Sequence, residues 1–337
     1  MTRAQPALRS TRDEIAEVIV SGSARSGIEA VLGRLAAEYG SADNPDFVRR
    51  AAGLGHLLPT EVCDQVRDMR YLESASVLVV RGGPLSGAPQ ATPAHWSERP
   101  PYGSVIEDFW LALVSAQLGD AVCWSSLQDG RLLTDVLPIK GEEDQQTGHG
   151  SEAELEFHVE DAFHDDRCDT LALLALRNDD AIPTTVSTAA SLDLSTLDLD
   201  VLFEARFRIH PDPEHVRDHV PSADEADRIR PVLYGHRESP YLRVDPTFTE
   251  TLPGDLRARQ AFTELCAQLN RNLVDVVLER GDLLLIDNHR AVHGRRRFQA
   301  RYDGTDRWLR KMTTVRDLRR SRGRRAGADV RAISPFS

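Results

Sequence analysis

The stretch LEFHVEDAF, residues 155–163, combines the pattern of a β-strand with side chains that can bind a metal ion. Apolar and polar residues alternate along it, and successive side chains on a strand point to opposite faces. One face should therefore pack against a core, while the other carries His158 and Glu160 side by side. Taken alone, a His-x-Glu pair on a polar strand face is usually only solvated surface.

A further metal-binding candidate lies far downstream, in GDLLLIDNHRAVHGR, residues 281–295. A buried strand here is followed by His289 and His293. A second imidazole, delivered from a distant strand end, could complete a set of two histidines and one carboxylate. Such a facial triad leaves coordination positions open and suits non-haem Fe(II). The Gly-Arg after His293 favours that residue, at a point where the chain turns, and His289 is the alternative ligand.

Arg307 stands in RYDGTDRWLRKM, residues 301–312, at the start of another expected strand. An arginine that faces the interior of a barrel needs an anion, and a carboxylate that accepts two of its N–H groups satisfies it best. The simpler interpretation is a structural salt bridge to Asp303 or Asp306 nearby.

The composition weakly favours a small substrate or a protein partner over nucleic acid. The 337 residues carry 41 basic and 53 acidic side chains, a formal net charge of −12, which disfavours binding to phosphate backbones. Four dispersed cysteines show no CxxC pairing, so we expect reduced thiols. No signal peptide and no apolar run long enough to cross a membrane is visible, so we expect a soluble, cytoplasmic protein. The oligomeric state does not follow from the sequence.

The order of apolar and turn-forming segments predicts a mainly β protein with flanking helices. Residues 12–40 and 44–71 look helical, 75–81 reads as a buried strand, and 105–119 as a helix. From about residue 120, roughly ten short strands alternate with turns, which indicates a barrel or a jelly roll. A helix at about 255–278 interrupts them, and the segments 142–152 and 211–228 look like mobile loops. We expect the basic tail to form a solvated helix on the body.

Three motifs together match the layout of Fe(II)/2-oxoglutarate oxygenases, namely HxE, a distal histidine after a buried strand, and an arginine fourteen residues later. FHVEDAF, SPYLRVD, DNHRAVHGR and RYDGTDRWLRKM resemble the clavaminate synthase-like group of that superfamily. The resemblance is greatest to enzymes that hydroxylate free L-amino acids, such as asparagine oxygenase, the arginine hydroxylase of viomycin biosynthesis and the lysine hydroxylases. It covers roughly residues 75–320, with 1–74 as a helical segment packed on the barrel and 321–337 as a tail.

The resemblance implies a double-stranded β-helix (jelly roll) that uses Fe(II), 2-oxoglutarate and O2 and releases succinate and CO2. It places the iron ligands at His158, Glu160 and His293, and it gives Arg307 the distal carboxylate of 2-oxoglutarate. A threonine that assists Arg307 would be Thr184 or Thr185, of which we favour Thr185. Halogenating relatives lack the carboxylate ligand, so Glu160 favours hydroxylation.

The same resemblance assigns residues to an amino-acid substrate. Gln128 would hold the α-ammonium, Lys311 the α-carboxylate and Asp245 the side chain, while His149 would touch the substrate from the loop 145–151. Relatives often carry arginine at position 311, so Lys311, preceded by Arg310, is a departure. The arginine hydroxylase has a second acid where this chain has Thr247, which argues mildly against a guanidinium. Side chains of the lysine, ornithine, asparagine, glutamine or arginine-like type remain candidates, with hydroxylation at C3 or C4.

Two other functions are compatible with these motifs. The same cofactors could support desaturation or ring closure of an antibiotic-pathway intermediate, because this fold does not determine the outcome of the reaction. A jelly-roll binding protein with a vestigial metal site is the non-enzymatic alternative.

Overall fold

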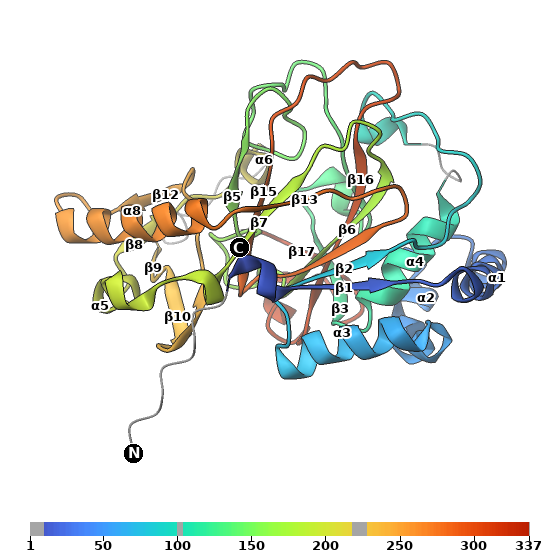
Figure 1. Cartoon of the computed structure of the whole chain (residues 1–337), viewed down its shortest axis with the longest axis horizontal. Coiled ribbons are helices and arrows are strands. Elements are labelled where there is room, and N and C mark those ends of the chain that lie inside the picture. Colours follow the sequence, from blue (N-terminus) through green and yellow to red (C-terminus); the bar gives the residue numbers. More distant parts are fainter. Residues whose placement is uncertain (1–9, 100–103, 218–227, 337) are drawn as a thin grey trace.

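Two β-sheets form the centre of the computed structural model, which describes residues 10–99, 104–217 and 228–336 (Figure 1). The larger sheet has the strand order β1-β2-β14-β6-β16-β3-β17, with β4 also paired to β16, and the smaller sheet has the order β13-β7-β15-β5. The strands of the larger sheet are β1 (Ile15–Ile19), β2 (Val77–Arg81), β3 (Asp120–Trp124), β4 (Thr134–Val136), β6 (Thr170–Arg177), β14 (Leu283–Asp287), β16 (Trp308–Val315) and β17 (Ala332–Ile333). Those of the smaller sheet are β5 (Leu155–His158), β7 (Thr184–Thr188), β13 (Val274–Val276) and β15 (Ala291–Arg295).

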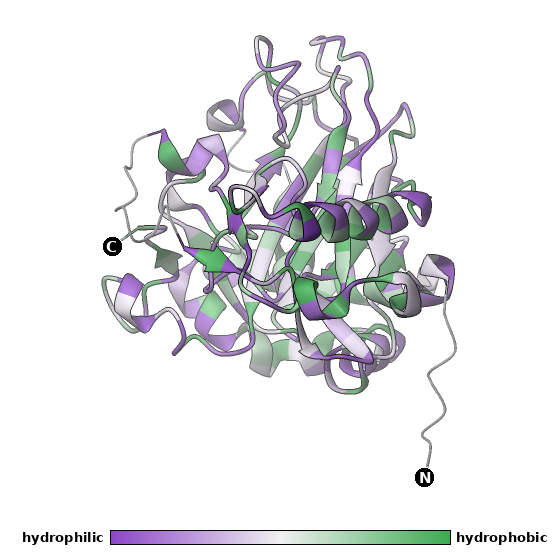
Figure 2. Cartoon of the chain, turned by 90° about the vertical axis from the view of Figure 1, so that its left-hand side faces the viewer, coloured by the Kyte–Doolittle hydropathy of each residue, from purple (hydrophilic) through white to green (hydrophobic). Residues whose placement is uncertain are grey.

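Both faces of the larger sheet are buried, which explains why its central strands β2, β6 and β14 are apolar along most of their length. Alternate residues of each strand enter two different cores. On β2, Leu78 and Val80 pack against the N-terminal helices, whereas Val77 and Val79 pack in the core that also holds Val186 of the smaller sheet. In Figure 2, hydrophobic residues gather in the central strands and hydrophilic ones on the outer loops.

The N-terminal helices cover the outer face of the larger sheet (Figure 1). They are α1 (Gly22–Tyr39), α2 (Pro45–Arg50), α3 (Thr60–Leu72) and α4 (Val105–Ser115), with short 3-10 turns at η1 (Thr11–Glu14), η2 (Ala51–Leu57) and η3 (Trp96–Glu98). The helix predicted for residues 12–40 is wrong at its start. Residues 15–19 instead form β1, parallel to β2, and Ser21 caps α1 by accepting a hydrogen bond from the N–H of Ala24.

A second group of elements packs beside the smaller sheet around its own core. It comprises α5 (Leu199–Leu202), α6 (Pro213–Val216), α8 (Leu256–Arg271), the three-stranded sheet of β8 (Phe207–Ile209), β9 (Ile229–Arg230) and β12 (Thr249–Thr251), the hairpin of β10 (Leu233–His236) and β11 (Ser239–Leu242), and the 3-10 turns η5 (Ala189–Ser191) and η6 (Leu194–Thr196). The 3-10 turn η4 (Gln128–Gly130) lies next to β3 instead, where Gly130 accepts a hydrogen bond from Cys123. The helix predicted for 255–278 ends earlier, because Val274 and Val276 pair with β7 instead. Part of the predicted loop 211–228 is α6, and its residues 218–227 lie outside the described part of the chain.

The basic tail does not form the expected helix. It folds into turns, η7 (Arg322–Arg324) and β17, which pairs in parallel with β3. The guanidinium of Arg325 is buried and donates to the backbone carbonyls of Leu318, Gly327, Ala328 and Val330, so its hydrogen bonds stabilise the turns of its own segment. None of the described helices has the length and apolar character needed to cross a membrane.

Candidate active site

The pairing of β5 with β15 brings the predicted metal ligands together. His158 and His293 are direct partners in this antiparallel pair, and their ring centroids lie 4.6 Å apart. Glu160 follows β5 by two residues, and its Oε2 lies 3.4 Å from Nε2 of His293. One ligand atom from each residue lies within 4.8 Å of the other two. Residues 135 positions apart in the chain thus form one cluster.

The protonation states of the cluster fit a divalent cation. Burial lowers the pKa of His293 to about 4, so its imidazole is neutral and can donate a lone pair. Burial alone would raise the pKa of Glu160, but the ammonium of Lys311 and the two imidazoles hold it well below its usual value. Two imidazoles and a carboxylate match the facial set that binds non-haem iron. Nδ1 of His293 is buried without a hydrogen-bond partner among the described residues. Buried polar atoms usually have such a partner, so this exception fits an imidazole that serves as a metal ligand rather than as part of the hydrogen-bonded framework.

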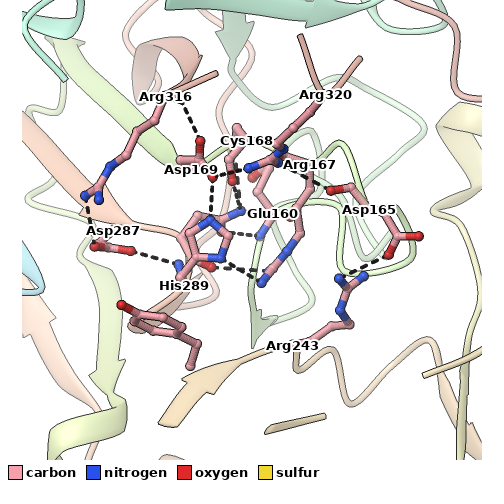
Figure 3. A network of polar contacts seen from close by, with 12 residues as sticks. Glu160, Asp165, Arg167, Cys168, Asp169, Arg243, Asp287, His289, Arg316 and Arg320 are labelled. Atoms are coloured by element: carbon pink, nitrogen blue, oxygen red, sulfur yellow. Dashed lines mark hydrogen bonds and ion pairs between the residues drawn. The ribbon is translucent and has the colours of Figure 1, made fainter. Parts of the chain in front are cut away.

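His289, the alternative ligand, is engaged elsewhere. Its Nε2 lies 2.6 Å from Oδ1 of Asp169, and its Nδ1 faces the Tyr234 hydroxyl and, at 3.3 Å, the Arg167 guanidinium. Figure 3 shows His289 inside this network, in contact with Asp169 and Arg167. Because both ring nitrogens have partners, His289 belongs to the framework behind the cluster.

Arg307 supplies a buried cation on the same cavity. Its Nη2 donates to Oγ1 of Thr184 at 2.9 Å, and no carboxylate forms an ion pair with it in the described part of the chain. Burial and the neighbouring Arg295 lower the pKa of Arg307 to about 9. Asp306, one of the salt-bridge partners considered above, instead accepts hydrogen bonds from the backbone N–H groups of Arg301 and Tyr302. A buried guanidinium without a carboxylate creates a site for an anion.

The threonine beside Arg307 is Thr184, not the favoured Thr185. Both belong to β7, where consecutive side chains point to opposite faces. Thr184 lines the cavity, whereas Oγ1 of Thr185 packs against Gly294, 2.9 Å from where a Cβ of that glycine would lie. The sequence pattern showed two candidates but not which face of β7 meets the cavity.

The cavity next to the cluster contains carboxylates beyond the predicted Asp245. It has an empty volume of about 900 Å³ including its open mouth, and Asp212 and Glu214 from the α6 segment also line it. Burial raises the pKa of Asp245, and it raises the pKa of Asp212 to about 6. Sequence reasoning missed Asp212 and Glu214, because isolated acids in a polar segment look like ordinary surface.

The other predicted substrate residues lie at or beyond the edge of this cavity. Lys311 points into it, with Nζ 2.6 Å from Oε1 of Glu160, while Arg310 points away and forms a buried ion pair with Asp135. Gln128 lines an adjoining cavity that shares Lys311, and its amide exchanges two hydrogen bonds with the backbone of Asp135. His149 is buried in that second cavity, with Nδ1 3.0 Å from the carbonyl of Leu137.

Comparison with known proteins identifies the family. Residues 127–313 match the family described as taurine catabolism dioxygenase TauD, TfdA family. The chain is 37% identical over 330 residues to enduracididine beta-hydroxylase of Streptomyces hygroscopicus, covering 91% of this chain and 96% of that protein. It is also 37% identical over 338 residues to L-ornithine/L-arginine 3-hydroxylase of Catenulispora acidiphila, with the same coverage of 91% and 96%. The chain belongs to the TauD/TfdA family.

Solved structures agree with this assignment. The non-heme iron oxygenase OrfP in complex with Fe and alpha-ketoglutaric acid superposes with a TM-score of 0.87 at 41% identity, covering 94% of this chain and all of that one. OrfP in complex with Fe and L-Arg gives a TM-score of 0.84 at 40% identity, covering 94% of this chain and 99% of that one. These matches confirm the predicted jelly roll and the predicted enzyme class, an oxygenase that depends on Fe(II), 2-oxoglutarate and O2.

Within this TauD/TfdA site, the α6 segment is fastened beside the cavity by one histidine. His215 is 1% exposed, its Nδ1 lies 2.8 Å from Oγ of Ser126, and its Nε2 lies 3.0 Å from Oδ1 of Asp161. Its ring packs against Trp124 and Phe163. Because His215 lies next to Glu214 and three residues after Asp212, these contacts hold both acids at the cavity wall.

Proposed function

We propose that the protein hydroxylates a free L-amino acid with a cationic side chain, at C3 or C4, with release of succinate and CO2. In this proposal His158, Glu160 and His293 bind the iron, which activates O2 together with 2-oxoglutarate. Arg307 and Thr184 bind the distal carboxylate of 2-oxoglutarate. The observation that supports a cationic substrate is the group of three carboxylates, Asp212, Glu214 and Asp245, on the cavity wall.

Electrostatics favour a cation between these carboxylates. Asp212 and Asp245 are both buried enough to have raised pKa values, so each carboxylate is destabilised in its charged form. An ammonium or guanidinium in the cavity would offset this cost through charge-assisted hydrogen bonds. Ornithine, arginine and enduracididine, the amino acids in the names of two relatives, carry such groups.

The position of Thr247 does not argue against a substrate with a guanidinium group. The sequence argument relied on Thr247 in place of a second acid, and Thr247 instead donates a hydrogen bond to Glu156 at 3.0 Å. Asp212 and Glu214 supply acidic groups from another segment. We therefore include arginine-like substrates together with ornithine and lysine, and we rank asparagine and glutamine below them.

The α-carboxylate of the substrate would lie at Lys311, on the border between the main and the adjoining cavity. Gln128 and His149 would then act from the adjoining cavity, with Gln128 closer to the α-ammonium. All four cysteines are free, which fits the reducing cytoplasm that we propose as the location.

A mass-spectrometric screen tests this function. The protein would be mixed with Fe(II), ascorbate and 2-oxoglutarate, and with L-arginine, L-ornithine, L-lysine, L-asparagine or L-glutamine in turn. We expect one of the cationic amino acids to gain one oxygen atom, with one succinate formed per product. A loss of two hydrogens would indicate desaturation, and modification of asparagine alone would refute the role of the acidic wall. Asp245→Asn is the matched variant, because it should raise KM for the amino acid without changing KM for 2-oxoglutarate.

A further inference from the structure

The turn between β14 and β15 holds the peptide group of Glu160. Asn288 lies in this turn, fully buried, and its Oδ1 accepts a hydrogen bond from the backbone N–H of Glu160 at 2.7 Å. Its Nδ2 donates to the carbonyl of Glu160 at 3.0 Å and to the carbonyl of Cys168 at 2.9 Å. One amide thus satisfies both backbone polar groups of Glu160. Figure 3 shows Glu160, Cys168 and His289 close together in this network.

Glu160 needs such a partner because it lies beyond the end of its strand. β5 ends at His158, and the next residue, Val159, bonds to the carbonyl of Val244 rather than to β15. Asp161 then takes a left-handed conformation with φ 54°, which turns the chain away. The strand ladder therefore does not orient the peptide of Glu160, and the Asn288 amide takes its place as a hydrogen-bonding partner.

The turn that carries Asn288 is itself held firmly. The backbone N–H of Asn288 donates to the carbonyl of Asp169 at 3.0 Å, and His289 bonds to the carboxylate of the same residue. Arg290 forms an ion pair with the buried Glu14 at 2.9 Å. Directly after this turn, β15 begins and carries His293. One fixed turn therefore connects the two chain segments that bear the three clustered ligands.

We infer that Asn288 is a positioning residue for the metal site, which directs the carboxylate of Glu160 through its peptide group without touching metal or substrate. The inference rests on the ligand role of Glu160 in the proposed function. Hydrogen-bonding partners of ligands in other metal sites change metal affinity by about 10- to 100-fold when they are replaced. We expect a loss in this range here.

Asn178 provides a matched control. Its amide makes the same pattern of three bonds in the turn after β6, accepting from the N–H of Ile182 at 3.0 Å and donating to the carbonyls of Ile182 at 3.1 Å and Leu278 at 2.9 Å. It is buried as well, at 8% exposed, but it bonds to neither segment of the cluster. Replacing Asn178 should therefore cost comparable stability without affecting Glu160.

The experiment measures Co(II) binding to the metal-free protein, by titration and by the d–d absorption of the complex. The variants are Asn288→Asp, Asn288→Ser and Asn178→Ser, and thermal unfolding of each metal-free protein reports stability. Asn288→Asp keeps the shape of the side chain but removes its donor. For both Asn288 variants we expect the Kd for Co(II) to rise by about tenfold or more and the absorption spectrum of the complex to change. For Asn178→Ser we expect the Kd and the spectrum of the wild type.

The outcomes separate the inference from the proposed function. If the Asn288 variants fold and bind Co(II) with the wild-type Kd and spectrum, Asn288 is only structural and the inference fails. If Asn178→Ser weakens Co(II) binding as much as Asn288→Ser does, the effect is general destabilisation and the inference fails as well. His158→Ala should weaken Co(II) binding in either case, and an unchanged Kd in that variant would refute the proposed ligand set itself.

Discussion

Lys311 and Glu160 form a partly buried ion pair in which Nζ lies 2.6 Å from Oε1, while the other carboxylate oxygen faces His293 at 3.4 Å. The carboxylate is thus shared between the ammonium of Lys311 and the imidazole of His293. Burial opposes the charge on Lys311, but Glu160 raises the pKa of its ammonium, so the side chain stays charged. In the proposed function, this ammonium would also bind the α-carboxylate of the substrate.

Replacing Lys311 by methionine tests its proposed contact with the substrate carboxylate. The variant keeps an apolar stem of similar length and loses the charge, so we expect KM for the amino acid to rise about 10- to 100-fold, the effect of losing a charged hydrogen bond. KM for 2-oxoglutarate should stay within about twofold, because the proposed function gives that contact to Arg307. Steady-state kinetics with each substrate varied in turn measures both values. A larger change for 2-oxoglutarate than for the amino acid would contradict the assignment.

A pair of isosteric substitutions on β7 tests the correction from Thr185 to Thr184. Thr184→Val removes the hydroxyl that accepts a hydrogen bond from Arg307, and we expect KM for 2-oxoglutarate to rise about fivefold, corresponding to about 1 kcal/mol. Thr185→Val should leave this KM unchanged, since its side chain packs against Gly294. The reverse result would restore Thr185 as the cosubstrate contact.

Arg307→Met should remove stabilisation by 2-oxoglutarate without destabilising the ligand-free protein. The guanidinium is buried without a carboxylate partner in the described part of the chain, so its removal leaves no unpaired anion behind. With Co(II) present, 2-oxoglutarate at about 100 times its Kd should stabilise the wild type by about 2.7 kcal/mol and the variant far less. Thermal unfolding with and without 2-oxoglutarate gives both values. An equal gain in the two proteins would make Arg307 purely structural.

The raised pKa of Asp212 predicts that the stability of the protein depends on pH. Its pKa in the folded protein is raised to about 6 by burial, above the value in an unfolded chain, so the carboxyl destabilises the fold increasingly as the pH rises from about 4 to 6. Asp212→Asn, which can still cap α6, should therefore be more stable than the wild type by up to about 3 kcal/mol at pH 7, and by roughly half of that at pH 5. Urea unfolding at both pH values measures the difference. A difference that does not depend on pH would show that Asp212 titrates normally.

The metal cluster was predictable because its signals are local. His158 and Glu160 show the strand alternation directly, and His293 follows shortly after the apolar run of β14, although it lies in the middle of β15 rather than at the end of a strand. The choice between His293 and His289 was harder. It depends on Asp169, more than a hundred residues away in the chain, which engages His289. The spacing of residues in the sequence does not reveal the contact between His289 and Asp169.

Other features depend on tertiary contacts that a pattern does not reveal. IAEVI, residues 15–19, is too short to distinguish a strand from the first turn of a helix, and only its pairing with β2 decides. Asp212 and Glu214 line the cavity because the hydrogen bonds of His215 to Ser126 and Asp161 hold α6 beside it. The face of β7 that meets the cavity, and with it the choice of Thr184, likewise follows from how the two sheets pack.

The position of β1 has a consequence for any attempt to shorten the protein. β1 covers the outer edge of β2, and the neighbouring Glu14 bonds to Arg290 in the turn between β14 and β15, directly before the strand that carries His293. A fragment that begins at residue 75 would expose the unpaired backbone of an apolar strand, which is a template for aggregation. It would also leave Arg290 without this carboxylate. We therefore expect residues 15–19 to protect the edge of the larger sheet from pairing with other chains, a role separate from catalysis.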